Sequence, residues 1–384
     1  MAIYLDNAAT TFPKPPSVAA AVTRTLTDAA GNPGRGAHRL SLDAGRILFE
    51  TREAVSEMFG VGDPARVVFT ANATMALNLA LFGFLAPGDR VVTTSMEHNA
   101  VTRPLRALAE TGVQVVKVAG DALGSVNPQL LMEACRAERT RMLVLSHCSN
   151  VSGTLQAIDE LGPWCRREGI LLLVDAAQSA GLFPLHLEAG AIDLLAAPGH
   201  KGLYGPQGTG FLCLAQGLVP RPLIYGGTGG NSHSELPPEQ LPERLEAGTP
   251  NTPGLAGLKA GIDFIRSVGM TKIRAREAQL NGQLLEGLQA IPGISLFGPR
   301  DPEQRGGAVS FLLAGRDPAE IGFLLDRDHG ILTRVGLHCA PDAHQTLGTF
   351  PRGTIRVSPG YFNTSDDIEQ LLAALAFLAN QPAD

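Results

Sequence analysis

Seven short apolar runs follow one another within the first 214 residues, and each has the length of a buried strand. The runs are continuous rather than alternating, and Gly, Pro, Asp or Asn bounds each of them. Continuous apolar strands are typical of a sheet that is covered on both faces. The segments between the runs have helical spacing, which favours a mostly parallel, doubly wound α/β sheet. The predicted strands cover residues 66–70, 90–94, 113–118, 141–146, 170–175, 192–197 and 209–214.

The pattern changes after about residue 250. Two helices are predicted over residues 252–269 and 270–291, and a last helix is predicted from about residue 365. Asp317 followed by Pro318 marks the start of a further helix, because Asp caps helices well and Pro fits their first position. Short strands are predicted over residues 294–297, 306–313, 331–335 and 354–358. These elements form a smaller α+β domain, and 384 residues exceed one ordinary hydrophobic core, so we expect two domains.

The composition is typical of a soluble globular enzyme, with 44% hydrophobic residues, 18% charged residues and a net charge of −6. No basic tract that could neutralise phosphates is present, so we expect neither nucleic acid nor a membrane as a partner. The N-terminus lacks the features of a signal peptide, and no apolar run approaches the ~20 residues that cross a bilayer. The five cysteines are scattered and form no C-x-x-C pair. This argues against a disulfide framework or a metal site and predicts a reducing, cytoplasmic location.

Three places in the larger predicted domain carry polar residues that are suited to chemistry. A helix starts near Thr74 directly after a strand, where free N–H groups bind anions, although an ordinary helix cap explains the same residues. Asp175 ends a buried strand, where it is either paired with a cation or caps a helix. Lys201 follows another buried strand among glycines, and a lysine in so apolar a setting loses its proton easily and forms Schiff bases. No glycine-rich phosphate loop in the required context is present, so a nucleotide site is poorly supported.

Together these elements describe a site for pyridoxal phosphate. The chain resembles the class V aminotransferase-like pyridoxal enzymes, in particular the cysteine desulfurases and selenocysteine lyases. The resemblance implies PLP fold type I, with a large PLP-binding domain over residues 15–252 and a small domain over residues 1–14 and 253–384 that carries the cysteine loop. It runs almost end to end through the motifs YLDNAATT (4–11), GNPGRGAHRLS (31–41), MEHNA (96–100), SHCSNVSGT (146–154), VDAAQSAG (174–181), GHKGLYGP (199–206), EAGTPNT (246–252), RVGLHCA (334–340) and IRVSPGYFNT (355–364).

The resemblance implies a role for one residue or more in most of these motifs. Lys201 is expected to form the Schiff base and to move the substrate's α-proton, Asp175 to keep the ring nitrogen protonated, and His98 to stack on the ring. One further contact, from Thr249, is expected to come from a second subunit, which implies a homodimer with shared active sites. The other expected contacts are Gln178 on the ring hydroxyl, Asn150 near that hydroxyl and the substrate carboxylate, Arg356 on that carboxylate, Thr74, the Met75 amide and His200 on the phosphate, and the partner's Thr249 on the same phosphate.

Cys339 is the candidate nucleophile. Considered alone, it is a loop thiol that could also fill space or bind a metal, but no further ligands at metal spacing accompany it. The resemblance implies that its sulfur accepts the sulfur of L-cysteine as a persulfide, which leaves L-alanine. Arg334 is a candidate for activating the thiol, since the thiolate is the nucleophile.

The short loop around Cys339 resembles the compact loops of group II-like desulfurases, which often depend on an acceptor protein or thiol to remove the sulfur. Iron–sulfur cluster assembly, RNA thiolation and another thio-cofactor pathway are all open as destinations. A selenocysteine lyase that acts on L-selenocysteine is an alternative, as is another lyase, an epimerase or an aminotransferase of the same fold. A protein of this fold without catalytic activity is opposed by the intact set Lys201, Asp175, His98 and Arg356.

Two positions depart from the family pattern. Pro198 stands where many relatives have a phosphate-binding Ser or Thr, and Gly202 is an additional residue after the lysine. We therefore expect one phosphate contact to be missing or supplied by water. The other histidines and cysteines carry weaker expectations: His147 and Cys148 pack in the core or a loop, His38 either lines the entrance of the site or does not, and Cys135, Cys165 and Cys213 are structural.

Overall fold

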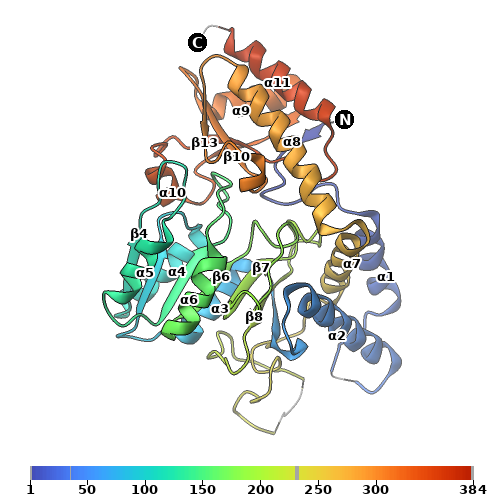
Figure 1. The fold of residues 1–384 in the computed structure, drawn as a ribbon. Coiled ribbons are helices and arrows are strands. Elements are labelled where there is room, and N and C mark those ends of the chain that lie inside the picture. Colours follow the sequence, from blue (N-terminus) through green and yellow to red (C-terminus); the bar gives the residue numbers. More distant parts are fainter. Residues whose placement is uncertain (1, 35, 230–232, 382–384) are drawn as a thin grey trace.

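The structure is a computed structural model that describes residues 2–34, 36–229 and 233–381. It has two lobes (Figure 1). The lower lobe is built around a seven-stranded sheet and the upper lobe around a four-stranded sheet. Two lobes of this kind agree with the α/β and α+β halves that the sequence predicts.

The seven strands that the apolar runs predict all form, and they make one sheet in the order β2-β8-β7-β6-β5-β3-β4. Neighbours from β7 to β4 pair in parallel, and β8 runs antiparallel to both β7 and β2. The prediction of a mostly parallel sheet is therefore confirmed. The strands are β2 (Val67–Thr70), β3 (Arg90–Thr94), β4 (Gln114–Val118), β5 (Met142–Ser146), β6 (Leu171–Asp175), β7 (Leu194–Pro198) and β8 (Gly210–Leu214).

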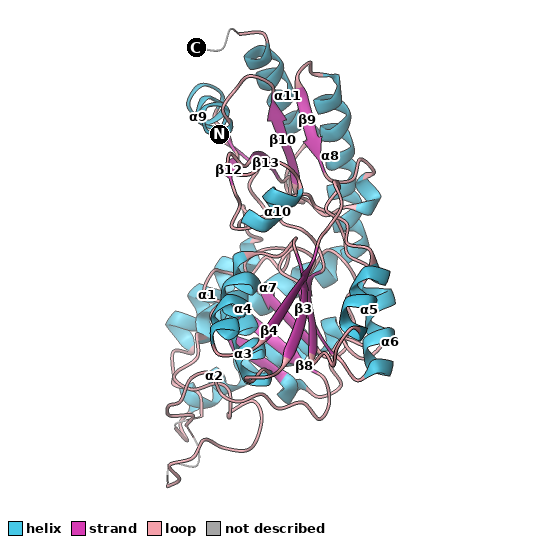
Figure 2. Ribbon diagram, turned by 90° about the vertical axis from the view of Figure 1, so that its left-hand side faces the viewer, coloured by secondary structure: helices cyan, strands magenta, loops and turns pink. Residues whose placement is uncertain are grey.

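Helices cover both faces of this sheet. One face packs on α3 (Ala73–Phe84) and α4 (Asn99–Glu110), and the other on α5 (Pro128–Arg136) and α6 (Ile158–Glu168), as Figure 2 shows. Every residue of β5 and β7 is buried, which explains why their apolar runs are continuous. Because β3, β5, β6 and β7 are parallel, their carboxyl ends meet at one edge, where α/β sheets bind ligands.

The upper lobe holds an antiparallel sheet in the order β12-β13-β10-β9. The helices of this lobe bury its apolar core, and the side chain of Asp317 caps α9 as predicted. The N-terminal β1 (Ile3–Tyr4) pairs in parallel with β11 (Ile331–Leu332), so the start of the chain is tied to this lobe. The other elements are β9 (Ile294–Phe297), β10 (Val309–Leu313), β12 (Arg334–Gly336), β13 (Thr354–Val357), α8 (Met270–Ala290), α9 (Pro318–His329) and α11 (Ser365–Ala379).

The junction between the lobes lies near α7 (Thr252–Val268) and α8, which meet at Gly269. The helix α7 packs on α1 (Pro16–Asp28) and α2 (Arg39–Phe59) of the lower lobe, while α8 packs on α11 of the upper lobe. The predicted boundary between residues 252 and 253 stays a prediction. Three short segments complete the described elements: the 3-10 turns Pro64–Arg66 and Pro302–Gln304, and α10 (Pro341–Thr346), which lies between the upper lobe and β4 (Figure 1).

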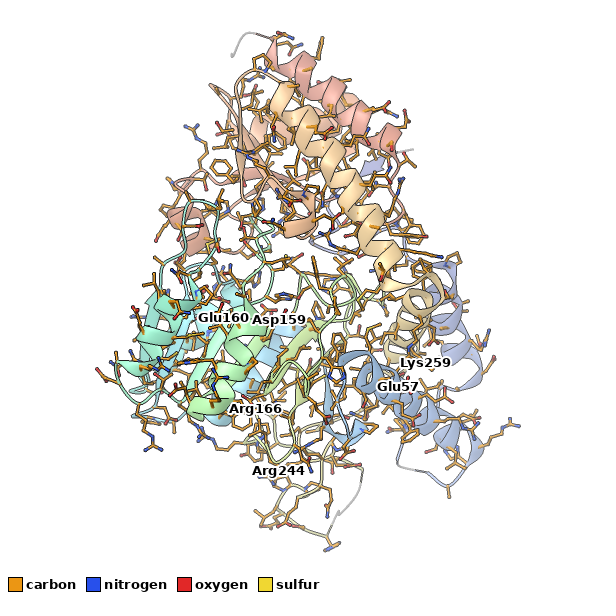
Figure 3. The ribbon with its side chains drawn as sticks, in the orientation of Figure 1. Glu57, Asp159, Glu160, Arg166, Arg244 and Lys259 are labelled. Atoms are coloured by element: carbon orange, nitrogen blue, oxygen red, sulfur yellow. The ribbon has the colours of Figure 1, made fainter. Side chains whose placement is uncertain are left out.

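Charged side chains of both signs are spread over the outer helices (Figure 3). Helix α6 is an example, since Asp159 and Glu160 lie in its first turn and Arg166 in its last, an arrangement that complements the helix dipole. Within the residues that the structure describes, no helix has the length and hydropathy needed to cross a membrane.

Candidate active site

A cavity of about 230 Å³ lies at the carboxyl ends of β5, β6 and β7 and is closed by residues of the upper lobe. Its wall includes every predicted site residue except Met75 and Thr249. The predicted residues that line it are Thr74, His98, Asn150, Asp175, Gln178, His200, Lys201, Arg334, Cys339 and Arg356. Segments that are far apart in the sequence are thus brought to one place.

Asp175 ends β6 on the floor of this cavity. Its carboxylate accepts a hydrogen bond from the N–H of Ala177 at 2.9 Å. Burial raises the pKa of Asp175, while the Ala177 bond and the charge of Lys201 oppose the rise. A buried carboxylate in a cavity wall is stabilised by a cationic group, so this position suits a positively charged partner.

Lys201 follows β7, and its pKa is lowered to about 8. Burial is the main cause, and Arg356 and Arg334 add to it, while Asp175 opposes it. The backbone around this lysine is held by the N-terminal segment, because Thr11 Oγ1 donates to the Lys201 carbonyl at 2.8 Å and Lys14 Nζ donates to the His200 carbonyl at 2.5 Å. The amine is therefore both poised to lose its proton and fixed from the backbone side.

The additional Gly202 has a structural reason. A Cβ atom at this position would lie 2.4 Å from the carbonyl oxygen of Ala180, which is closer than real Cβ contacts allow. Tyr204, two residues later, has φ 58° and is buried, and its N–H donates to the Lys201 carbonyl. The turn after the lysine thus needs a glycine because it packs directly on the backbone that follows β6.

His98 begins α4 as its N-cap. Its Nδ1 accepts the N–H of Ala100 at 3.0 Å, so a neutral imidazole carries its proton on Nε2. The pKa of His98 is lowered to about 4, first by burial and then by the positive charge of Lys201. The ring therefore lines the cavity as an uncharged group at neutral pH.

Glu97, next to His98, is a buried residue to which the sequence analysis gave no role. Its carboxylate accepts hydrogen bonds from Thr94 Oγ1 at 2.6 Å, Ser146 N–H at 2.9 Å and Ser146 Oγ at 2.8 Å. Burial raises the pKa of Glu97 to about 7, with a further rise from Asp175. The residue joins the ends of β3 and β5 and fixes the turn that presents His98.

Arg356 is fully buried on β13 and forms a salt bridge with Asp6, with 2.6 Å between Nη2 and Oδ1. Its Nη1 donates to the Asn150 carbonyl at 3.0 Å, and its Nε has no partner among the residues that the structure describes. Ser310, Arg356 and Arg334 lie directly opposite one another on β10, β13 and β12, so they form one row on the sheet face. Asp6, within the motif YLDNAATT, is a second residue that the sequence analysis did not assign.

Cys339 is exposed, whereas the other four cysteines are buried. His338 and Cys339 have φ values of 48° and 60°, a left-handed conformation that costs roughly 1–3 kcal/mol for such residues. The carbonyl of His338 accepts from Asn150 Nδ2 at 2.7 Å and that of Cys339 from Asn99 N–H at 2.7 Å. Arg334 Nη2 lies 3.6 Å from Cys339 Sγ and donates to it. The surroundings hold the thiol in a strained turn next to a cation.

The start of α3 and the segment around His200 form the end of the cavity expected for phosphate. Asn72 caps α3, and its side chain accepts the Met75 N–H at 2.9 Å, so an anion has to compete for that amide. Thr74 and Pro198 line the cavity, and His200 Nδ1 is buried without a partner among the described residues. Both earlier explanations of this helix start thus have support, since a cap is present and the helix end faces the cavity.

Gln178 and Thr249 complete the predicted set. Gln178 lines the cavity and its Nε2 donates to the Ala8 carbonyl at 3.0 Å. Thr249 lies instead in a separate groove of about 920 Å³ that also contains the exposed apolar side chains of Phe49 and Ile224. Met75 borders the same groove, so the two regions meet at the start of α3.

The residues with weaker expectations lie as follows. Cys148 and His147 are buried, and Cys148 also borders the cavity. His38 caps α2 and is absent from the cavity wall. No group of His, Cys, Asp and Glu residues in the described parts of the chain is arranged to bind a metal ion.

Comparisons with known proteins agree with this geometry. The sequence family "Aminotransferase class-V" matches residues 3–371. A protein of Methanothermobacter thermautotrophicus named "Probable cysteine desulfurase" is 37% identical over 98% of this chain and 94% of its own length. A protein of Pyrococcus abyssi with the same name is 34% identical over 97% of this chain and 93% of its own.

Solved structures give the same result. The apo structure of a cysteine desulfurase from Thermococcus onnurineus superposes with a TM-score of 0.91 at 32% identity and covers 98% of this chain and 94% of that one. The cysteine desulfurase CsdA from Escherichia coli, in an S-sulfonic acid form, gives a TM-score of 0.87 at 29% identity with the same coverage.

Proposed function

Because the chain belongs to the class V aminotransferase family, in the branch whose curated members are named cysteine desulfurases, we propose that it converts L-cysteine to L-alanine and accepts the sulfur on Cys339. One observation carries the proposal. The exposed Cys339 shares a cavity with a half-buried lysine of lowered pKa and a buried arginine. A nucleophile, a base and a carboxylate-binding group are thus within one small space.

The residues of the cavity fit pyridoxal phosphate. Asp175 is a buried carboxylate with a raised pKa, which suits a cationic ring nitrogen. His200 Nδ1 is buried and unpartnered, and the start of α3 faces the same space, which suits a phosphate group. When bound, the cofactor supplies an electron sink and a Schiff base with Lys201. Gln178 and His98 are then assigned to the ring, and Thr74 and His200 to the phosphate.

Arg356 is assigned to the substrate carboxylate. Its Nε is buried and has no partner in the described part of the chain, and a carboxylate beside it would supply the missing acceptor. The salt bridge to Asp6 and the Asn150 carbonyl hold the guanidinium plane in place. Asn150 is assigned to the same end of the substrate. Lys201 Nζ then removes the α-proton and returns it, as its lowered pKa allows near neutral pH.

Cys339 performs the sulfur step. Its thiolate, next to the Arg334 guanidinium, attacks the substrate sulfur, and a new S–S bond forms while the Cβ–S bond of the substrate breaks. The electron pair of the broken bond stays with the three-carbon fragment, which takes up a proton and becomes L-alanine. Cys339 is oxidised to a persulfide in the same step. Its exposure leaves the persulfide open to an acceptor protein or thiol.

The proposal is tested by supplying L-cysteine, L-selenocysteine and L-cystine separately to protein that carries the cofactor. Alanine, pyruvate, sulfide and selenide are measured, together with the mass of the peptide that contains Cys339. We expect alanine from L-cysteine and one added sulfur atom on Cys339. Pyruvate in place of alanine would show elimination and reject the persulfide mechanism. A preference for L-selenocysteine without sulfur on Cys339 would favour the lyase alternative.

We also propose that the enzyme is a homodimer. The groove that holds Thr249 includes the exposed apolar side chains of Phe49 and Ile224 and reaches Met75 at the start of α3, next to the site cavity. A second copy bound there would cover the groove and bring its own Thr249 towards the phosphate end. Sizing by light scattering is expected to give twice the chain mass, and Phe49→Asp to give monomers. Monomeric wild-type protein would reject this arrangement.

A further inference from the structure

The loop between β5 and α6 is attached to the upper lobe through its backbone. The carbonyl oxygens of residues 150–153 each accept a hydrogen bond from a donor of the upper lobe. In order, the donors are Arg356 Nη1 at 3.0 Å, Ser310 Oγ at 2.7 Å, Arg305 Nη2 at 3.0 Å and Gly306 N–H at 2.8 Å. We call residues 150–153 with these donors the carbonyl row.

Arg305 is one of two buried cations in this row, and Arg356 is the other. Its side chain has no exposed surface, and it donates to the carbonyls of Ser152, Pro299 and Ala308. Among the residues that the structure describes, no carboxylate forms a salt bridge with it. A buried charge without a counter-ion is costly, and here the three backbone carbonyls are what compensates the buried guanidinium.

The neighbouring backbone is shaped around this guanidinium. Gly153 has φ 73°, and a Cβ atom there would lie 3.1 Å from Arg305 Nη2 and 2.6 Å from the Ala308 carbonyl oxygen. A Cβ atom at Gly298 would lie 2.1 Å from the Ser152 carbonyl oxygen. The two glycines therefore provide the close approach that the row requires.

The carbonyl row is hydrogen-bonded, through Asn150, to Arg356 and to the turn that carries Cys339. The Asn150 carbonyl holds Arg356 Nη1, and the Asn150 side chain holds the His338 carbonyl, one residue before Cys339. Arg305 itself is not part of the cavity wall. It can act on the reaction only through the loop that it fixes.

We propose that Arg305 is a positioning residue that orients, through Asn150, both the carboxylate-binding Arg356 and the strained turn of Cys339. The part that concerns the substrate carboxylate rests on the proposed function. The part that concerns the thiol does not, because the Asn150–His338 bond exists whatever the substrate is. The two parts can therefore be measured separately.

The test uses Arg305→Met, Arg305→Lys and Ser310→Ala in cofactor-loaded protein. Met keeps an unbranched apolar stem but removes every donor, and Lys keeps the charge but cannot span the Ser152 and Ala308 carbonyls as a fork. Ser310→Ala removes one hydrogen bond of the carbonyl row, the one to the Val151 carbonyl, without removing a charge. Arg300→Met is the matched control, since Arg300 lies nearby, is exposed and donates to the Leu296 carbonyl outside the row.

Two quantities are measured: KM and kcat for L-cysteine, and the rate of iodoacetamide alkylation of Cys339 followed by peptide mass. We expect both Arg305 variants to raise KM about 10-fold, with a smaller change in kcat, and to change the alkylation rate at least ~3-fold. Ser310→Ala should change KM and the alkylation rate in the same direction by a smaller factor. Arg300→Met should have the KM, kcat and alkylation rate of the wild type.

Folded Arg305→Met with wild-type KM and wild-type alkylation would overturn the proposal. A lower melting temperature with both quantities unchanged would overturn it as well, because it would leave only a structural role. If Arg305→Met does not fold, Ser310→Ala decides between the same outcomes. If the wild type makes no alanine, the proposed function fails, while the alkylation rates still decide the positioning role.

Discussion

The floor of the cavity, formed by Asp175, Lys201 and His98, differs in exposure and conformation from the wall, formed by the turn around Cys339. On the floor, Asp175, Lys201 and His98 sit at the ends of strands or the start of a helix, and burial shifts the pKa of each. On the wall, Cys339 is exposed and lies in a left-handed turn. On the floor, burial shifts the pKa values of the side chains, whereas on the wall the backbone geometry sets the direction of the Cys339 side chain.

This difference matches the secondary structure of the two regions, which is a sheet edge on the floor and a loop on the wall. A sheet edge under helices is rigid and dry, so electrostatic interactions there are strong. A thiol that must pass sulfur to an acceptor needs contact with solvent, and therefore lies on a loop that others hold in place. Because Cys339 is exposed, its loop is held by the hydrogen bonds from Asn150 and Asn99 to the loop carbonyls rather than by burial.

The largest expected effect comes from the floor. Lys201→Ala removes the base and should lower alanine formation by about 10⁴-fold, the upper range for a lost general base. The alkylation rate of Cys339 should stay at the wild-type value, since the wall keeps its own supports. A changed alkylation rate would show that floor and wall are not independent. Alanine assays and alkylation of the same preparation give both values.

Cys339→Ser should have the next largest effect. The hydroxyl is a far weaker nucleophile toward sulfur, so alanine formation from L-cysteine should fall by about 10³-fold. The visible absorption of the bound cofactor should not change, because the floor is intact. Cys135→Ala, which alters a buried cysteine on α5, is the control and should keep its activity. Unchanged turnover by the serine variant would remove the thiol from the mechanism.

A third comparison uses pH. In protein freed of cofactor, Lys201 should react with a small aldehyde with a midpoint near pH 8, because burial lowers its pKa to about 8. The reactive neutral amine is the form present above the pKa, so the rate rises with pH. At pH 9 the reactive fraction is about 30-fold larger than for an ordinary lysine. Asp175→Asn should lower the midpoint further, since the Asp175 charge raises this pKa. A midpoint near that of free lysine would show that burial does not lower the pKa of Lys201.

The smallest effect is expected at the edge of the wall. Lys117 on β4 and Asp342 on α10 form a salt bridge of 2.5 Å, with 45% and 25% of the two side chains exposed. Such pairs contribute roughly 0–1 kcal/mol, so Lys117→Met should lower the free energy of unfolding by less than ~1 kcal/mol. Denaturant unfolding measures the change, and Arg106→Met, in an exposed pair on α4, is the matched control. A loss well above that of the control would mean that α10 is a main support of the loop.

The sequence predicted the floor better than the wall. Continuous apolar runs identified the buried strands, and Asp175 and Lys201 follow from their positions at strand ends. The salt bridge between Asp6 and Arg356, the buried Glu97 and the carbonyl row of Arg305 join segments that are distant in the chain, so no local pattern indicates them. The left-handed turn at Cys339 was also missed, because a non-glycine residue gives no sign of a positive φ. The Met75 amide was expected to be free, but the Asn72 side chain occupies it.

The salt bridge between Asp6 and Arg356 also bears on how the protein is made. The two residues are 350 positions apart, and β1 likewise pairs with β11 near the end of the chain. At ribosomal speeds of about 5–20 residues per second, the N-terminal segment waits roughly 20–70 s for its partner to be synthesised. A growing chain can therefore complete the lower sheet before β1 and Asp6 have their partners from the upper lobe. The salt bridge forms only after β13 leaves the ribosome, and a product truncated before residue 339 would lack both Cys339 and Arg356.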